Sequence, residues 1–356
     1  MTIFISVASY RDEELEKTVR SLYDNASDKN SLVFGIVNQN ERGKFSDFDW
    51  LGDQVRLYNM HYKDAKGAGY ARKVAQELYG GEDFYFQVDS HMRFVEGWDD
   101  KLIGMHHWAR EHEGTPNIIL SQFPAPYLAG SDGKDYPIVD DPDFWDEPSW
   151  TSVVNTWTSV WAGNREKMPN FDYPHKSHTV LGALLFSHCK IVKDIPYDER
   201  ISFMGEELCF AIRAYTRGYE IYAPNEMVAT HFYKRRERPK IWLDNIAGRS
   251  WTDIEMESQR VQKRVLLGIE DGIYGIGDYQ KYLDYQEMVG YNFEKFYEED
   301  MGFKVNMGLI TQEIEFDENF QLIQISKTGY CLNGFHSKCL AKEICDCKCH
   351  EGTLDE

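Results

Sequence analysis

The sequence predicts an α/β fold in which helices flank a mostly parallel, doubly wound sheet. Over the first 120 residues, short runs of β-branched and aromatic residues alternate with longer amphipathic stretches. Strands that alternate with helices in this way form parallel sheets. The chain has 356 residues, 42% of them hydrophobic and 28% charged, so it can bury a substantial core in one large domain or two smaller ones.

The predicted elements follow one another in a regular order. The first third of the chain gives strands at 2–8, 32–38, 55–59, 84–89 and 118–121, with helices at 13–23, 70–78 and 98–111. Later patterns predict strands at 180–187, 220–223 and 227–231, a helix at 207–217, and mostly helical structure from 239 to about 300. Because ligands of such sheets bind beyond the carboxyl ends of the strands, the residues after each strand are the candidates for a site.

Four consecutive parts are expected: residues 1–120 and 121–238 as two halves of the α/β domain, 239–328 as a helical extension, and 329–356 as a small tail rich in Cys and His. Residues 122–178 contain many Pro, Asp, Trp and Tyr residues with weak periodicity. An irregular segment of this length inside a compact domain is usually a functional loop.

The charge of the chain limits its partners. Lys and Arg number 39 against 59 Asp and Glu, a formal charge of −20, so general binding of nucleic acid is not expected. No apolar run reaches the roughly 20 residues of a membrane helix, and the first residues lack a basic leader. We therefore expect a cytoplasmic protein with no signal peptide and no membrane span.

A metal site is predicted where the strand at 84–89 ends. Asp89 and His91 are two positions apart, so in extended backbone both side chains point the same way. A carboxylate with an imidazole suits Mn²⁺ or Mg²⁺. His231 ends another predicted strand and is the candidate third ligand. The alternatives are a capping Asp beside a partly buried His, and a structural His231.

Such a cation would allow an acidic chain to hold a nucleotide diphosphate. Arg11 follows the first strand, and the turn at Gly67 exposes backbone N–H groups to an anion just before Arg72. The stretch from Lys66 to Arg72 matches neither a Walker loop nor a dinucleotide motif. A helix cap with a surface arginine is the structural alternative.

Two adjacent carboxylates, Glu206 and Glu207, open a predicted amphipathic helix. Neighbouring helical positions diverge by about 100°, so the two cannot share one role. One of them could contact a sugar hydroxyl or the acceptor, although acidic residues also favour a helix N-terminus for electrostatic reasons. The small residue Gly182, in the predicted strand 180–187, would let a sugar ring lie close to the backbone.

The combination of these motifs resembles the GT-A glycosyltransferases of family 60, the polypeptide α-N-acetylglucosaminyltransferases related to the cytoplasmic hydroxyproline-directed enzymes. The resemblance covers residues 2–295 and rests on the order and spacing of several short stretches: 5–12 (ISVASYRD), 67–72 (GAGYAR), 87–94 (QVDSHMRF), 205–207 (GEE), 217–219 (RGY), 231–235 (HFYKR), 258–260 (SQR) and 274–277 (YGIG).

The resemblance implies a GT-A fold whose first half binds a nucleotide sugar and whose second half faces the acceptor. It implies a UDP-sugar donor, a divalent cation held by Asp89, His91 and His231, and transfer with retention to a hydroxyl, most simply on a protein. Asp89, Glu206 and Glu207 would be the catalytic residues. The donor contacts would be Ser9, Tyr10, Arg11, Asn38, Lys66, Gly67, Arg72, Asp89, Ser90 and Gly182.

The tail lies outside this resemblance. Seven possible ligands fall in its 20 residues from 331 to 350, namely Cys331, His336, Cys339, Cys345, Cys347, Cys349 and His350. Thiolates at this density favour tetrahedral Zn²⁺, and disulfides or a disordered tail are the alternatives.

Three other functions stay open on the sequence alone. The acceptor could be a DNA base or a glycan, with the basic run at 234–238 contacting it. The chain could also be a metal-dependent hydrolase, or a catalytically silent module that binds sugar.

Overall fold

The computed structural model describes residues 1–129, 135–137, 172–233, 238–244, 246, 248–289, 292–294, 314–316 and 322–325. Contacts divide the chain into two units, one of residues 1–155 and 161–290 and the other of residues 156–160 and 291–356. In the second unit, the strands β13 (Ile314–Phe316) and β14 (Leu322–Ile325) form an antiparallel pair. All other elements given below belong to the first unit.

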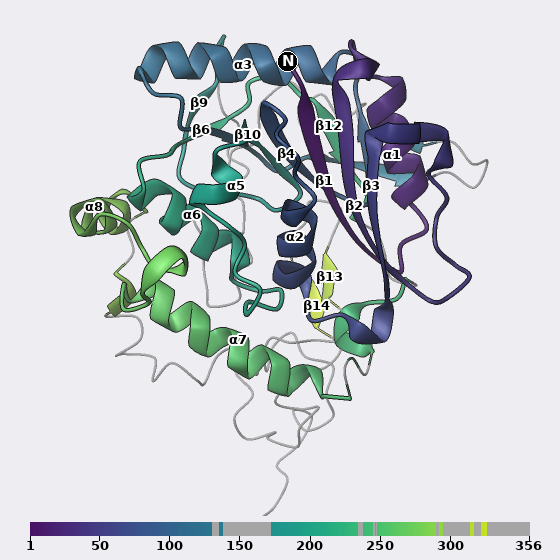
Figure 1. Cartoon of the computed structure of the whole chain (residues 1–356). Coiled ribbons are helices and arrows are strands. Elements are labelled where there is room, and N and C mark those ends of the chain that lie inside the picture. Colours follow the sequence, from purple (N-terminus) through teal and green to yellow (C-terminus); the bar gives the residue numbers. More distant parts are fainter. Residues whose placement is uncertain are drawn as a thin grey trace, which may run out of the picture. The chain divides into compact units, whose positions relative to one another are not determined.

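An eight-stranded sheet forms the centre of the first unit (Figure 1), in the order β3-β2-β1-β4-β10-β6-β11-β9. The strands β3, β2, β1 and β4 are parallel, β6 and β11 are parallel, and β10 and β9 run antiparallel to their neighbours. The bounds of these strands are β1 Ile3–Tyr10, β2 Leu32–Asn40, β3 Val55–His61, β4 Phe84–Asp89, β6 Ile118–Ser121, β9 His175–Ser177, β10 Leu184–His188 and β11 Glu220–Ala223.

A second sheet brings the end of β12 to the turn that follows β4. It has the order β5-β12-β7-β8, with β5 (Met92–Phe94), β12 (Ala229–His231), β7 (Ala125–Ala129) and β8 (Asp135–Pro137). Because β5 follows β4 after only two residues and pairs with β12, the end of β12 lies against the turn that leaves β4. The sequence did not predict β5 as a strand, since three residues carry almost no periodic signal.

The helices of the first unit surround the sheet (Figure 1). They are α1 Leu15–Asp24, α2 Ala68–Glu77, α3 Trp98–Glu113, α5 Ile191–Asp194, α6 Glu206–Thr216, α7 Trp251–Leu266 and α8 Tyr279–Val289. Short 3₁₀ turns are η1 Lys29–Ser31, η2 Asp49–Gln54, η3 Tyr62–Asp64, η4 Ile241–Leu243 and η5 Gly272–Tyr274. None of the helices in the described ranges has both the length and the apolar character that crossing a membrane requires.

Helix α1 shows how the pattern of the sequence produces the core. Leu15, Val19 and Leu22 are spaced by four and three residues and therefore share one helical face. That face is fully buried in the same cluster as Ile5 and Val7 of β1. Helix α2 covers β1 and β2 with small residues, so it can approach closely. The core thus fixes β1 and β4 as rigid central strands.

The main predictions of the fold are confirmed: the sheet is mixed but mostly parallel, and helices flank it. Two strands are shorter than predicted, and the strand predicted at 227–231 begins only at Ala229. The predicted strand at 180–187 begins only at Leu184, because Leu181 bridges back to Leu184 around a turn that contains Gly182. Much of the block at 122–178, and the tail from 329, lie outside the described residues.

Candidate metal and donor site

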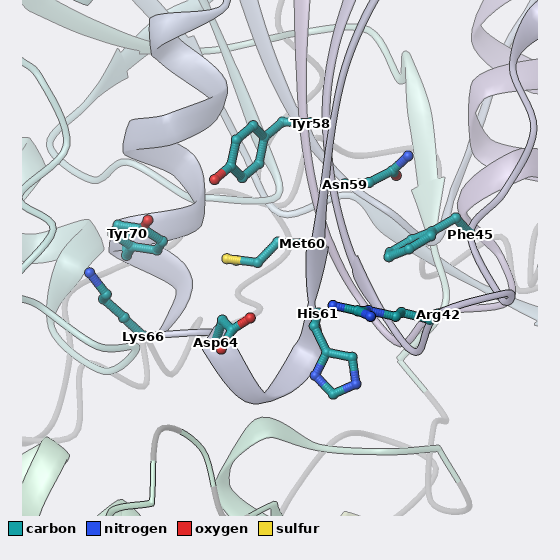
Figure 2. A pocket seen from close by; sticks show the side chains of 9 residues that line it. All are labelled: Arg42, Phe45, Tyr58, Asn59, Met60, His61, Asp64, Lys66 and Tyr70. Atoms are coloured by element: carbon teal, nitrogen blue, oxygen red, sulfur yellow. The ribbon is translucent and has the colours of Figure 1, made fainter.

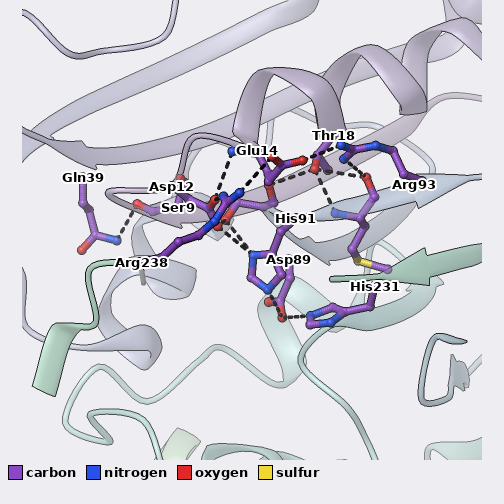
Figure 3. Close-up of polar contacts among 12 residues, drawn as sticks. Ser9, Asp12, Glu14, Thr18, Gln39, Asp89, His91, Arg93, His231 and Arg238 are labelled. Carbon is purple, nitrogen blue, oxygen red and sulfur yellow. Dashed lines mark hydrogen bonds and ion pairs between the residues drawn. The ribbon is translucent and has the colours of Figure 1, made fainter. Parts of the chain in front are cut away.

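Asp89, His91 and His231 converge at the carboxyl end of β4 (Figure 3), and one ligand atom of each lies within 4.8 Å of the others. Asp89 is the last residue of β4, His91 lies in the turn to β5, and His231 ends β12. Nε2 of His231 is 3.2 Å from Oδ2 of Asp89, and Nε2 of His91 is 3.9 Å from the same oxygen. Three residues that are far apart in the chain thus form one cluster.

The position of this cluster follows from the buried strand that carries it. β4 lies between β1 and β10, and all its residues before Asp89 are buried. Gln87 fixes the strand by donating to the carbonyl of Gly182 and to the Tyr197 hydroxyl, both at 2.8 Å. Asp89 itself is about a quarter exposed, so its carboxylate is held rigidly and still reaches solvent.

The electrostatics of the cluster suit a cation. Burial alone would raise the pKa of Asp89, but the hydrogen bond with His231 and the charges of Arg72 and the two histidines hold it far below its usual range. Asp89 is therefore a carboxylate at any physiological pH. One carboxylate oxygen with two imidazole nitrogens is a donor set that Mn²⁺ accepts and that leaves further positions for other ligands.

Arg72 and the two glutamates form a second group beside the cluster. The Arg72 guanidinium is buried and contacts both Glu206 and Oδ1 of Asp89, the latter at 3.1 Å. Glu207 points elsewhere and accepts from the backbone N–H of Gly182 at 2.6 Å. The expected divergence of the two glutamates is therefore present, and Arg72 is a buried ion-pair partner rather than a surface arginine.

Glu207 differs from Asp89 in its ionisation. Burial raises the pKa of Glu207 to about 7, although the Gly182 N–H bond and the charge of Arg72 oppose the shift. The surroundings therefore lower the pKa of Asp89 and raise the pKa of Glu207, although both carboxyl groups lie near Arg72. Such separation is typical of active sites, although structural ion pairs also produce it.

Ser90 lies in the turn after β4, and the remaining predicted donor residues lie along the ends of β1 and β2 and at the start of α2. Ser9 and Asn38 are buried. The Tyr10 hydroxyl donates to Asp244 at 2.7 Å, and Arg11 pairs with both Asp244 and Glu41. Arg11 has a φ of 47°, an uncommon backbone conformation for a residue other than glycine, so this end of β1 is held tightly against the segment around Asp244.

Lys66 and Gly67 lie immediately before α2. Gly67 has a φ of 117°, and a Cβ there would meet the carbonyl of Ser202, so only glycine suits the turn into α2. The Lys66 ammonium lies 4.4 Å from the centre of the Tyr70 ring.

A hollow of about 410 Å³ lies around the edge strand β3 (Figure 2). It includes the predicted donor residue Lys66 and none of the three cluster residues. Its lining residues are Arg42, Phe45, Tyr58, Asn59, Met60, His61, Asp64, Lys66 and Tyr70. The hollow and the histidine cluster are thus separate features of the fold.

A group of charged residues next to His91 was not predicted from the sequence. Asp12, Glu14, Arg93 and Arg238 form a network of ion pairs (Figure 3). Asp12 stood in one of the motifs but had no assigned role, and Arg238 was assigned to a basic run. Nothing in the local pattern links position 238 to position 12, because the contact spans 226 residues.

The seven Cys and His residues of the tail, from Cys331 to His350, lie outside the described residues, so the predicted zinc site stays a prediction. Within the described part of the chain, Cys189 and Cys209 are buried free thiols.

Comparison with known families gives a match to nearly the whole of the first unit. The model of a family described as Glycosyltransferase (GlcNAc) matches residues 2–49 and 47–292. The matched residues include the three members of the metal cluster and both glutamates of α6. No curated protein sequence matches the chain.

Solved structures of glycosyltransferases are similar to the chain at low sequence identity. The structure of GalNAc-T7 with UDP, GalNAc and Mn²⁺ is 14% identical, has a TM-score of 0.52, and is matched over 84% of this chain and 57% of its own length. The chain therefore spans little more than half of that protein.

Two structures of S. aureus TarS 1-349 are also similar. One is 13% identical, with a TM-score of 0.47, over 86% of this chain and 75% of TarS. The other, in complex with UDP-GlcNAc, is 14% identical, with a TM-score of 0.47, over 85% of this chain and 79% of TarS 1-349. Together with the sheet order described above, the likeness to GalNAc-T7 confirms the predicted GT-A fold.

Proposed function

The chain belongs to the GlcNAc glycosyltransferase family, and from this premise we propose that it transfers a sugar from a UDP-sugar to a hydroxyl acceptor, using a divalent cation bound by Asp89, His91 and His231. The observation that carries the proposal is the convergence of these three side chains at the carboxyl end of β4. This is the edge where ligands of parallel sheets bind.

The donor set of the cluster supports Mn²⁺ or Mg²⁺. GalNAc-T7, which shares the fold, was solved with UDP, GalNAc and Mn²⁺. When bound, such a cation would offset the negative charge that develops on the departing diphosphate. Asp89 and the two histidines would hold it, and Arg72 would keep Asp89 in place through the 3.1 Å ion pair.

Glu206 and Glu207 would serve different purposes. Glu206 holds the Arg72 guanidinium, so its role is to position Arg72 and, through it, Asp89. Glu207 lies at the Gly182 turn and would contact the donor sugar or the acceptor hydroxyl. In the retaining mechanism of family 60, which the motifs resemble, the departing phosphate oxygen accepts the proton of the acceptor, and no separate base is needed.

A protein hydroxyl is the acceptor that the resemblance favours, and GlcNAc or a related hexose is the sugar. The cytoplasmic location predicted from the sequence remains part of this proposal.

The first experiment measures UDP release from a panel of UDP-sugars with Mn²⁺, followed by mass spectrometry of candidate acceptor proteins. We expect one donor to give a metal-dependent product, and Asp89→Ala to abolish transfer without loss of fold. Asp194→Ala is the matched control, because the Asp194 side chain is as exposed as that of Asp89 and lies in α5, outside the site.

Metal-dependent transfer that survives in Asp89→Ala would refute the assignment of the site. UDP release that never yields an acceptor product would instead indicate a hydrolase, and sugar binding that needs neither UDP nor metal would indicate a silent binding module.

A further inference from the structure

We propose that Asp12 is a positioning residue that makes His91 a metal ligand, by binding its Nδ1 and turning its Nε2 toward Asp89 and His231. This inference rests on the proposed function, because it concerns the same cation site. It assigns a role to a residue that lies outside the three-residue cluster and for which the sequence predicted no role.

The side chain of Asp12 is fully buried, and its polar contacts include four with described residues. Its Oδ2 is 2.8 Å from Nδ1 of His91 and accepts from the Ser90 hydroxyl at 2.9 Å. Its Oδ1 accepts from the Arg238 guanidinium at 2.9 Å and from the backbone N–H of Glu14 at 3.0 Å. Figure 3 shows Asp12 and Asp89 on opposite sides of the His91 ring.

These contacts determine the tautomer of His91. Arg238 carries a permanent positive charge, so Asp12 beside it is a carboxylate and can only accept hydrogen bonds. Nδ1 of His91 must therefore carry a proton, so a ring that carries only one proton has its lone pair on Nε2. That atom is the one that lies 3.9 Å from Oδ2 of Asp89. A carboxylate that accepts from the outer nitrogen of a metal-binding histidine fixes the ring and increases its basicity.

The same contacts also give Asp12 a structural role, because it joins the start of α1 to the turn between β4 and β5. Both roles predict some loss of stability when Asp12 is changed. Only the positioning role predicts that the loss of metal affinity depends on His91, so the test must separate the two.

The test uses the full chain and Mn²⁺ alone. Asp12→Asn keeps the size of the side chain but can donate to Nδ1 and so favour the wrong tautomer. We expect its Mn²⁺ dissociation constant, measured by calorimetry and by electron paramagnetic resonance, to rise about 10- to 100-fold, while circular dichroism shows a folded protein.

Thr18→Val is the matched control. The Thr18 hydroxyl donates to the Ser90 carbonyl at 2.8 Å and accepts from the Met92 N–H at 2.9 Å, so it holds the backbone of the same turn. Neither of these hydrogen bonds involves Asp12 or His91. We expect this variant to be less stable and to bind Mn²⁺ with nearly unchanged affinity. If it loses affinity as strongly as Asp12→Asn, the effect of Asp12 is structural and the inference is wrong.

A double-mutant cycle tests the dependence on His91. In a His91→Ala background, Asp12→Asn should cause no further loss of affinity. An equal loss in both backgrounds, or unchanged affinity in Asp12→Asn, would overturn the inference and leave the proposed function intact. A failure of the unchanged protein to bind Mn²⁺ would overturn both.

A measurement on the unchanged protein completes the test and requires no variant. Nitrogen-15 NMR of the histidine rings distinguishes the two tautomers, and His91 should be protonated at Nδ1 in the absence of metal. Protonation at Nε2 would contradict the role of Asp12 directly.

Discussion

Two groups of histidines lie near opposite ends of β4 and differ in their neighbours. At the carboxyl end, His91 and His231 contact the carboxylates Asp12 and Asp89. At the other end, the ring of His106 packs against aromatic rings, with centroids 5.2 Å from Phe84 and 5.9 Å from Phe186.

The difference shows that burial alone does not make a histidine a ligand. Burial lowers the pKa of His106 to about 3, with further lowering from the nearby His107 and His188, so this ring is neutral and serves as part of the packing. At the other end, carboxylates fix the orientation of the rings and supply the negative charge that a cation needs.

The largest effect should appear in metal binding. His91→Ala and His231→Ala should each weaken Mn²⁺ binding by about 100-fold or more, because each removes a direct ligand, whereas outer partners alone cost about 10- to 100-fold. His106→Ala should leave the affinity unchanged. Calorimetry of all three variants checks the prediction, and a comparable loss in His106→Ala would remove the distinction between the two groups.

Acid should destabilise the protein through His106 of α3, which packs against the start of β4. The unfolded state binds a proton near pH 6.5, and the folded state does so only near pH 3, so the unfolding free energy falls as pH drops through this window. The slope is about 1.4 kcal/mol per pH unit for one proton, or about 2 to 3 kcal/mol between pH 6.5 and 4.5.

Urea unfolding of the unchanged protein and of His106→Gln across this range measures that contribution. The variant should show a shallower dependence on pH. Parallel curves for the two proteins would show that His106 has the same pKa in the folded and unfolded states and would contradict its packing role.

The carboxyl end should respond to acid in a lower window, through Glu14. Burial would raise the pKa of Glu14, but hydrogen bonds from Arg93, Lys17 and Arg238 lower it to about 2. Its contribution is therefore fully present above about pH 4.5 and is lost as pH falls toward 2. We expect Glu14→Gln to cost about 1 to 2 kcal/mol at pH 7.

Denaturation at pH 7 and pH 3 checks this sign. The difference between the unchanged protein and Glu14→Gln should shrink at the lower pH, and a difference that grows on acidification would show that the network does not favour ionised Glu14.

The smallest effect is expected at His188, which is exposed at the end of β10. Its Nδ1 accepts from the N–H of Lys190 at 3.2 Å, and little else depends on it. His188→Ala should change the unfolding free energy by less than about 0.5 kcal/mol. A larger loss in thermal unfolding would mean that this group of histidines is coupled as tightly as the one at the carboxyl end.

The sequence could predict those site residues whose position shows in the pattern of a single strand. Asp89, at the end of a buried strand, and His91, two positions later, were predicted as a pair because alternation along extended backbone places positions i and i+2 on one side. The prediction of His231 rested only on its place at the end of another predicted strand. The contacts of Arg72 with Asp89 and Glu206, and of Asp12 with His91 and Arg238, had no local signal.

Two elements that differ from the prediction have different explanations. The strand β5 has three residues, and the strand predicted at 180–187 is shortened by the turn at Gly182. β5 forms because it pairs with β12, which lies far along the chain, whereas the strand at 180–187 is shortened by the local bridge between Leu181 and Leu184.

The sequence by itself determined the order of strands and helices, the faces they bury, and the residues at the strand ends, since these depend on periodicity within one segment. Only the tertiary structure decided which ends meet. β12 reaches the end of β4 because it pairs with β5 in a second sheet, and Arg238 reaches Asp12 across 226 positions. Such contacts arise from packing between distant segments, and neither local sequence shows a pattern that indicates the other segment. The ligands of the site could therefore be proposed from the sequence, whereas the ion pairs and hydrogen bonds that support them could not.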